Sequence, residues 1–300
     1  MELIDLDYCK ELDRFTFMIK KRITSIYAGA RRSIKEGRGI DIVDYREYFP
    51  GDDIKTIAWK VYCRTERLYI RRFEEEKNLT THILVDCSKS MDFGEGIKKF
   101  DYGGMIAAGF AYLISNENER FALSTYSDEL KAVMQPKRGR RHFLNAVELL
   151  NSTQLEGQTK FDVCADQYSK MIRSRSLMIV VSDFLEPLSS LDTGIYKIAK
   201  GSHELVLIQV LDPKEKTLER IEGDTKLYDS ETSEMRRTYV SPAFKANFKR
   251  MLDEHTAAIK IICDDVGAEF FSITSDTPIF DAFLEIIEHK TPWERVTYYA

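Results

Sequence analysis

The sequence lacks the patterns that mark a disulfide framework, a structural zinc site or a membrane span. Its five cysteines are odd in number and form no C-x-x-C pair, and its five histidines are dispersed, which is typical of reduced, mostly buried thiols. No run approaches the roughly eighteen uninterrupted apolar residues of a membrane-spanning helix. The acidic start of the chain, with Glu2, Asp5 and Asp7, does not suit a signal peptide. We therefore expect a cytoplasmic protein that does not insert into a membrane.

Motifs for nucleotide and peptide chemistry are also missing. Gly94-Glu95-Gly96 is not followed by the glycine-lysine-serine of a phosphate-binding loop, and the chain contains neither G-x-S-x-G nor H-E-x-x-H. The formal net charge of −5 argues against wholesale binding of nucleic acid. These absences exclude a nucleotide-driven motor, and we expect no nucleic-acid partner.

The composition is that of an ordinary globular protein. The 300 residues, 43% apolar and 31% charged, are enough for one large domain with a smaller annex. Residues 3–28 carry apolar side chains at spacings of three and four, which predicts a helix. Residues 40–73 read as short extended pieces, broken by a turn at Phe49-Pro50-Gly51-Asp52-Asp53. We expect a helix and small β annex over residues 1–78 and a second domain over residues 79–300.

The second domain shows the alternation of strands and helices that is typical of an α/β fold. The predicted strands are residues 82–85, 120–126, 132–135, 177–181, 204–211 and 269–273. The predicted helices are residues 102–115, 141–151, 161–173, 188–200, 242–264 and 277–288. This alternation predicts a doubly wound, mostly parallel sheet with helices on both faces. A polar stretch over residues 214–240 predicts a β excursion, which we expect to lie beside residues 40–75.

One group of oxygen-bearing residues stands where such a fold places ligands. Asp86 ends the first apolar strand of the domain and is followed by Ser88 and Ser90 at alternate positions. Thr159 lies in a glycine-containing loop, and Asp183 follows the strand at 177–181. Ligands of doubly wound sheets bind outside the carboxyl ends of the strands, and carboxylate and hydroxyl oxygens suit a hard cation such as Mg²⁺. The alternative interpretation of the serines is a capped turn.

The pattern D-x-S-x-S, a later threonine and a later aspartate resembles the metal-ion-dependent adhesion site of von Willebrand factor A domains, whose fold is Rossmann-like. The resemblance implies that Ser88, Ser90 and Thr159 are direct ligands of a divalent cation. It implies that Asp86 and Asp183 act directly or through water. Mg²⁺ is the expected cation, with Mn²⁺ and Ca²⁺ as alternatives.

Further segments of the chain carry a more specific pattern: Asp44-Tyr45-Arg46-Glu47-Tyr48, Pro50-Gly51-Asp52, Ile57-Ala58-Trp59, Arg64 with Leu68, Phe73-Glu74, Met91 and Ser182-Asp183-Phe184. They resemble one bacterial group of such proteins, the domain-of-unknown-function family numbered fifty-eight. The resemblance covers about residue 35 to the C-terminus, and Gln158 departs from it because the family more often has glycine there. It implies an adaptor or co-chaperone that acts with a MoxR-type AAA+ ATPase.

Taken together, these features predict a non-enzymatic interaction module. A cation held by hydroxyls and two carboxylates retains positive charge, so an acidic side chain of a protein partner would complete its coordination. Catalysis by the ion would need an activated water and a nearby base, and the rim supplies no histidine. One alternative is a Mg²⁺-dependent hydrolase of haloacid dehalogenase type, although its second aspartate would stand at Ser88. The other alternative is an interaction protein in which the metal is purely structural.

Overall fold

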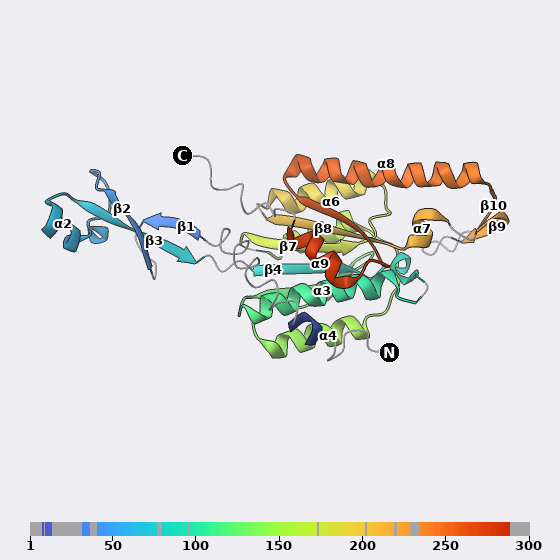
Figure 1. The fold of residues 1–300 in the computed structure, drawn as a ribbon, viewed down its shortest axis with the longest axis horizontal. Helices are drawn as coiled ribbons and strands as arrows, with labels where there is room; N and C mark the ends of the chain where they lie inside the picture. Colours follow the sequence, from blue (N-terminus) through green and yellow to red (C-terminus); the bar gives the residue numbers. More distant parts are fainter. Residues whose placement is uncertain are drawn as a thin grey trace. The chain divides into compact units, whose positions relative to one another are not determined.

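The computed structural model describes residues 8, 10–13, 32–36, 41–76, 80–94, 96–172, 174–201, 203–218, 221–228 and 235–288. The chain forms two compact units, one of residues 1–18 and 79–292 and the other of residues 19–78 and 293–300. Figure 1 shows the fold with colours that follow the sequence from blue at the N-terminus to red at the C-terminus. Within the described residues, no helix is both long and apolar enough to cross a membrane.

The larger unit is built on a six-stranded sheet. Its strands are β4 (Thr80–Asp86), β5 (Phe121–Tyr126), β6 (Leu130–Val133), β7 (Ser176–Ser182), β8 (Glu204–Leu211) and β11 (Glu269–Thr274). The strand order is β11-β8-β7-β4-β5-β6. All neighbours are parallel except β6, which pairs antiparallel with β5 at one edge. The predicted doubly wound, mostly parallel sheet is therefore confirmed.

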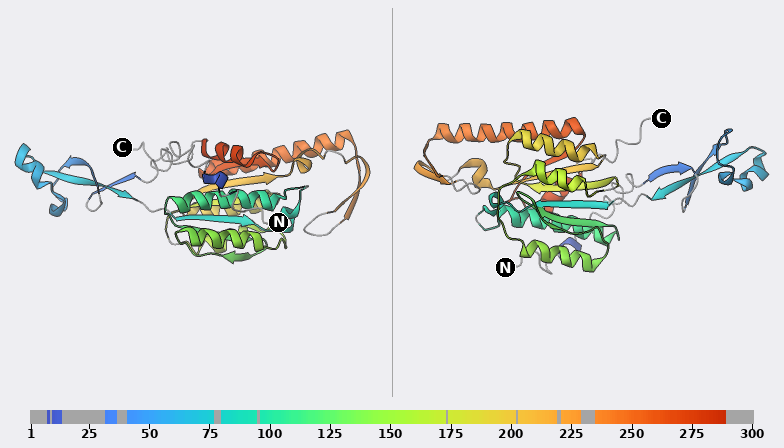
Figure 2. Two further views of the ribbon diagram at one scale, coloured as in Figure 1. Left: turned by 60° about the horizontal axis from the view of Figure 1, so that its bottom comes forward. Right: turned by 180° about the vertical axis from the view of Figure 1, so that it is seen from behind.

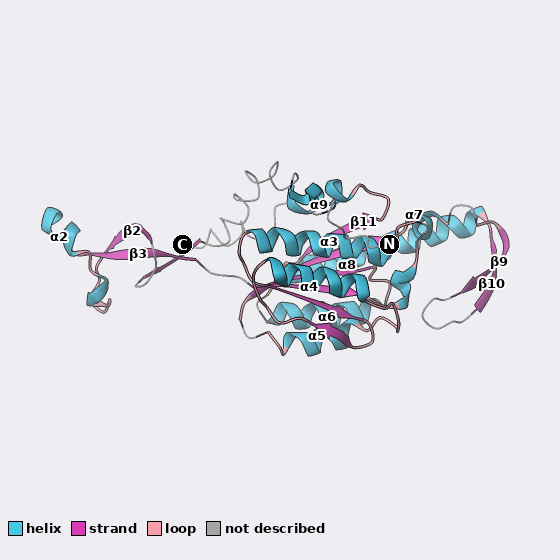
Figure 3. Cartoon of the chain, turned by 90° about the horizontal axis from the view of Figure 1, so that it is seen from below, coloured by secondary structure: helices cyan, strands magenta, loops and turns pink. Residues whose placement is uncertain are grey.

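Helices cover both faces of this sheet. They are α3 (Lys99–Asn116), α4 (Arg140–Ser152), α5 (Phe161–Ser169), α6 (Leu188–Lys200), α8 (Pro242–Val266) and α9 (Ile279–Glu288). Figure 1 shows α6 and α8 on one face and α3 and α4 on the other. Figure 2 shows the same two layers from other sides, and Figure 3 looks onto the face that α3 and α4 cover.

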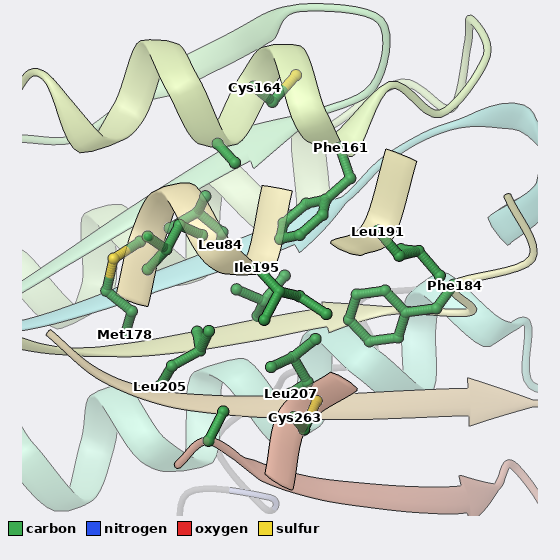
Figure 4. Packing of buried hydrophobic residues seen from close by; sticks show 14 of the residues in the cluster. Leu84, Phe161, Cys164, Met178, Phe184, Leu191, Ile195, Leu205, Leu207 and Cys263 are labelled. Carbon is green, nitrogen blue, oxygen red and sulfur yellow. The ribbon is translucent and has the colours of Figure 1, made fainter. Parts of the chain in front are cut away.

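The central strands are apolar because both of their faces are covered. Every residue of β7 is buried, and β4 and β8 are buried except at their first residues. On the α5 and α6 side, Leu84, Phe161, Phe184 and Ile195 belong to one packed cluster (Figure 4). This burial fixes the register of the central strands and so the position of the residues that follow their carboxyl ends.

On the opposite face, α9 packs against α3 at a glycine. A Cβ atom on Gly109 would lie 2.0 Å from the ring of Phe283, which is fully buried. The Phe283 ring also contacts Phe110 edge-on, with centroids 5.4 Å apart. Glycine at position 109 therefore allows the two helices to approach closely.

The smaller unit contains a three-stranded antiparallel sheet. Its strands are β1 (Arg32–Glu36), β2 (Asp41–Glu47) and β3 (Tyr69–Glu76), in the order β1-β3-β2. The predicted turn is confirmed, because Gly51 has a φ of 114° and the Asp52 amide donates to the Phe49 carbonyl at 3.1 Å. A short 3₁₀ helix, η1 (Ile54–Thr56), follows.

Helix α2 (Trp59–Thr65) was not predicted, since this stretch was interpreted as extended pieces. The helix contains no buried residue, so it lacks the apolar face that makes a helix visible in a sequence. It ends at Glu66, which has a left-handed conformation with φ of 54°.

The structure divides the chain differently from the expected annex of residues 1–78. Residues 1–18 group with the larger unit, where the Tyr8 hydroxyl donates to the Met105 carbonyl at 2.7 Å. Tyr8 and residues 10–13 are helical, and the rest of the predicted helix at 3–28 lies outside the described residues. The excursion at 214–240 contains a short helix, α7 (Pro213–Thr217), and the strands β9 (Gly223–Tyr228) and β10 (Met235–Val240).

The strands β9 and β10 pair antiparallel with each other in a sheet of their own. They do not join the three-stranded sheet of the smaller unit, and the expected placement of the excursion beside residues 40–75 stays a prediction. The pairing is local, because the two strands are close in sequence and satisfy each other's backbone groups.

Candidate functional site

The predicted site lies where the strand order of the large sheet reverses. β4 and β7 are neighbours, and the chain winds from them toward opposite edges of the sheet. Asp86 ends β4, and Ser182 ends β7 with Asp183 directly after it. Such a switch point is the usual ligand-binding position of a doubly wound sheet.

Asp86 is fully buried at this rim and receives several hydrogen bonds. Its Oδ2 atom accepts from the Ser182 hydroxyl at 2.6 Å and the Thr159 hydroxyl at 3.3 Å. Its Oδ1 atom accepts from the Ser88 amide at 2.8 Å. Burial and the neighbouring Asp183 charge raise the pKa of Asp86 to about 7, although the hydrogen bonds from Ser182 and Ser88 oppose the rise. Among the described residues, no ion pair involves Asp86.

Two loops bring the hydroxyl groups to Asp86. After β4, Ser88 precedes a short 3₁₀ helix, η2 (Lys89–Asp92), and its hydroxyl lies 3.0 Å from that of Ser90. The loop before α5 lies beside it, because the Lys89 amide donates to the Gly157 carbonyl at 3.1 Å. Ser88 is buried, whereas Ser90 and Thr159 are partly exposed. The structure therefore brings Asp86, Ser88, Ser90 and Thr159 together, with access from solvent on the Ser90 side.

Asp183 lies at the same rim but is engaged by a lysine. The Lys99 ammonium is 2.8 Å from Oδ2 of Asp183 and 2.8 Å from Oε1 of Glu215, and the Lys99 side chain is fully buried. Burial opposes the charge of Lys99, but the two carboxylates outweigh it, so the pKa of Lys99 is raised. Burial is the main cause that raises the pKa of Glu215. Asp183 therefore has a cationic partner, in contrast to Asp86.

The backbone around Asp183 is fixed from several directions. The buried Gln209 of β8 donates from Nε2 to the Asp183 carbonyl at 2.9 Å and accepts at Oε1 from Ser272 of β11 at 2.8 Å. The next residue, Phe184, is buried with a positive φ of 50°, and its carbonyl lies 2.8 Å from Nε2 of His255 on α8. A bulky residue holds this conformation only where its surroundings enforce it.

The donor set at Asp86 fits a small divalent cation. Mg²⁺ prefers six oxygens in an octahedron, in which adjacent oxygens are about 3 Å apart. The Ser88 and Ser90 hydroxyls are 3.0 Å apart, and the Thr159 hydroxyl is 3.3 Å from the Asp86 carboxylate. No cluster of three or more histidine, cysteine or acidic side chains suited to a metal occurs in the described part of the chain. A cation here would depend on hydroxyl oxygens and water, which is the ligand chemistry of Mg²⁺ rather than of zinc.

Sequence reasoning missed four participants at this rim: Ser182, Gln209, Lys99 and Glu215. Ser182 adjoins the predicted Asp183, so its place at the strand end was visible. Glu215 had a signal too, because Asp212 and Glu215 form a capping box at the start of α7, directly after β8. Lys99 had no such signal in the sequence, since a lysine at the start of a helix is normally interpreted as a solvated side chain.

Glu186, close to the rim, makes the stability of the protein depend on pH. Its Oε2 atom accepts from the Ser190 hydroxyl at 2.6 Å, while Oε1 has no partner within the described structure. Burial raises the pKa of Glu186 to about 7. Because the folded state holds this proton more tightly than the unfolded chain, the group's contribution to stability falls as pH rises between the two pKa values.

We expect Glu186→Gln to remove the part of this pH dependence that Glu186 contributes. Between about pH 4.5 and pH 8 the wild type should lose up to about 3 kcal/mol more of its free energy of unfolding than the variant. Urea unfolding at a series of pH values measures the difference. Glu148→Gln, which changes an exposed glutamate on α4, should keep the wild-type slope. Parallel pH profiles for wild type and Glu186→Gln would contradict the assignment.

Comparison with known proteins places the chain in a family. The family model described as "Protein of unknown function DUF58" matches residues 44–258. Two uncharacterized proteins, Rv1480 of Mycobacterium tuberculosis (strain ATCC 25618 / H37Rv) and Mb1516 of Mycobacterium bovis, are each 26% identical to this chain over 262 residues. Each alignment covers 86% of this chain and 82% of the relative.

Solved structures with similar folds have low sequence identity to the chain. One is the conserved hypothetical protein BatB from Bacteroides thetaiotaomicron, with a TM-score of 0.45. Another is an aerotolerance-related membrane protein from Bacteroides fragilis that carries multiple mutations to serine, with a TM-score of 0.48. Each is 10% identical to this chain, and each match covers 71% of this chain and 98% of the other. The SpRpn10 VWA domain is 15% identical with a TM-score of 0.41, covering 69% and 94%. The function of the present chain must be argued from its own residues.

Proposed function

The chain belongs to the DUF58 family of proteins of unknown function, and we propose that it is a metal-dependent protein–protein interaction module rather than an enzyme. Asp86, Ser88, Ser90, Thr159 and Asp183 would form the site, with Mg²⁺ as the expected cation. The observation that carries this proposal is the environment of Asp86. A fully buried carboxylate without an ion pair in the described structure is costly. The Asp86 carboxylate accepts hydrogen bonds from the Thr159 and Ser182 hydroxyls and the Ser88 amide, and the Ser88 and Ser90 hydroxyls lie next to each other beside it.

Each residue has a distinct part in this proposal. Ser88, Ser90 and Thr159 supply neutral oxygens, and Asp86 supplies negative charge close to them. Asp183, paired with Lys99, would act through water. Bound Mg²⁺ would supply a positive charge with room for one more oxygen ligand. The partly exposed Ser90 and Thr159 leave the solvent side of the site open to an acidic side chain.

The partner would present an aspartate or glutamate on an accessible loop. The family resemblance suggests that this partner is a MoxR-type AAA+ ATPase or one of its clients, so the chain would serve as an adaptor or co-chaperone in the cytoplasm. An acidic partner loop is consistent with a cation whose protein ligands are mostly uncharged, because the remaining positive charge attracts an anion.

The contacts at the rim favour this function over hydrolysis. A haloacid dehalogenase-type enzyme needs a general acid two residues after its nucleophile, and that position is Ser88, which donates its amide to Asp86. A purely structural metal is the remaining alternative. It predicts that the cation stabilises the fold but has no effect on partner binding.

The test is capture of the purified MoxR-type ATPase of the same organism by the immobilised chain, in Mg²⁺ or in EDTA. We expect capture in Mg²⁺ and its loss in EDTA and in Ser88→Ala, which removes only one hydroxyl. Ser152→Ala, at an exposed position on α4, should behave as the wild type. Capture that survives EDTA or Ser88→Ala would refute the proposal. Thermal stabilisation by Mg²⁺ without any capture would identify the metal as structural.

A further inference from the structure

Lys99 is an unusual group at the rim of the sheet. Lysines are almost never fully buried unless they are paired, and the Lys99 side chain has no exposed surface. It is also the first residue of α3, where the helix dipole disfavours a cation. The residue is therefore in place because of its two partners, the Asp183 and Glu215 carboxylates, each 2.8 Å from its ammonium.

The surroundings hold the Lys99 ammonium in one position. The Lys99 amide donates to the Phe93 carbonyl at 2.9 Å, which closes the loop before α3. The Phe93 ring lies 5.8 Å from the ammonium, within the range of a cation–π contact. On the other side, Glu215 belongs to the capping box of α7, so its backbone is fixed as well. Lys99 therefore has little freedom to leave Asp183.

The balance of charge at the rim follows from this pairing. The buried acids Asp86 and Asp183 and the largely buried Glu215 face one buried base. Lys99 neutralises Asp183 by direct contact, whereas Asp86 keeps no ion pair among the described residues. These three acids and one base leave two net negative charges at the rim, where three would remain without Lys99.

We infer that Lys99 is a specificity-determining residue that withholds the Asp183 carboxylate from the metal, so that the missing negative charge must come from the carboxylate of a partner. This inference rests on the proposed function and extends it. With Asp183 neutralised, the metal alone binds weakly, and an acidic ligand strengthens its binding. Without Lys99, Asp183 would supply that charge from within the chain, and the metal would bind without help.

The experiment is calorimetric titration of the full chain with Mn²⁺ or Mg²⁺ alone, in the absence of any partner. We expect Lys99→Met to bind the metal at least about tenfold more tightly than the wild type, because the charge change occurs in a buried environment where charges interact strongly. The matched control is Lys98→Met. It removes the same charge from the neighbouring residue, whose ammonium is exposed and pairs with Asp92 instead.

A double variant keeps the test decisive if Lys99→Met fails to fold without metal. Lys99→Met/Asp183→Asn removes both members of the ion pair and leaves no unpaired charge on Asp183. We expect its metal affinity to return to within about threefold of the wild type, since the net charge at the rim is restored. Loss of metal binding in the double variant would show that Asp183 is itself an indispensable ligand and would overturn the inference.

The remaining outcomes separate the inference from the proposed function. Equal metal affinity in the wild type and Lys99→Met would overturn the role of Lys99 while leaving a metal-dependent site intact. An equal gain in Lys98→Met and Lys99→Met would assign the effect to the general field of the protein and would also overturn it. No metal binding in the wild type or in any variant would overturn both the inference and the proposed function.

Discussion

Asp86→Asn is expected to be more stable than the wild type when divalent cations are absent, and to gain no stability from Mg²⁺. The folded protein raises the pKa of Asp86 to about 7, mainly through burial and then through the charge of Asp183. An unfolded chain ionises an aspartate near 4. Above about pH 7 Asp86 is ionised in both states, but only in the folded state is its charge buried. The free energy of unfolding therefore decreases as pH rises between the two pKa values.

The expected gain is up to about 4 kcal/mol at about pH 8, since each unit of pKa difference corresponds to about 1.4 kcal/mol. Asparagine can keep the hydrogen bond from the Ser88 amide and can donate to the Ser182 hydroxyl, so the packing should survive. Chemical unfolding with EDTA and with excess Mg²⁺ measures both effects. Asp192→Asn, on an exposed position of α6, is the control and should resemble the wild type.

An Asp86→Asn variant that is less stable than the wild type in EDTA would contradict the view that the buried charge lacks compensation. A variant that Mg²⁺ still stabilises would show that the cation binds elsewhere. The gain expected in EDTA is the decisive result, because a merely structural role of Asp86 would make the variant less stable than the wild type both in EDTA and in Mg²⁺.

A second large effect is expected where α9 packs against α3. Phe283→Ala should lower the free energy of unfolding of the larger unit by about 3–5 kcal/mol, because it empties a fully buried site. Gly109→Ala should lower it by about 1–3 kcal/mol, because the added methyl group would overlap the Phe283 ring. Thermal or urea unfolding measures both losses.

The neighbouring Gly104 offers a matched control within the same helix. A Cβ atom there has no heavy atom within 4 Å, so Gly104→Ala should stabilise the protein by up to about 1 kcal/mol through helix propensity alone. Combining Gly109→Ala with Phe283→Leu should recover part of the loss, since the smaller side chain leaves space for the methyl group. Additive losses in the double variant would rule out a direct clash between the two positions.

The sequence predicted the regular elements of the larger unit well because their burial leaves a strong pattern. The bounds of α6 and β8 are those expected from the apolar residues, 188–200 and 204–211. Helix α5 ends at Ser169, before the predicted end at 173, because the last turn carries no buried residue beyond Tyr168. Helix α2 was not predicted because none of its residues is buried.

The convergence of Asp86, Ser88, Ser90 and Thr159 could be predicted because each follows a strand or precedes a helix at one edge of a parallel sheet. Their role as ligands stays a prediction. The pairing of Lys99 with Glu215 could not be predicted, since the two residues are 116 positions apart and neither is hydrophobic. Periodicity reveals which residues are apolar and buried, but not which charged residues are.

Gln209 makes the loop at Asp183 more rigid than the sequence of that loop would suggest. A short surface loop ordinarily adapts its shape to each molecule that it meets. Here one amide side chain joins the loop at Asp183 to Ser272 at the far edge of the sheet and, at 3.3 Å, to Thr256 of α8. Reshaping the loop would break its hydrogen bond to Gln209, whose own position is held by Ser272 and Thr256. A ligand that bound at this rim would therefore meet a loop held in one shape, and the geometry of the ligand would decide whether it fits.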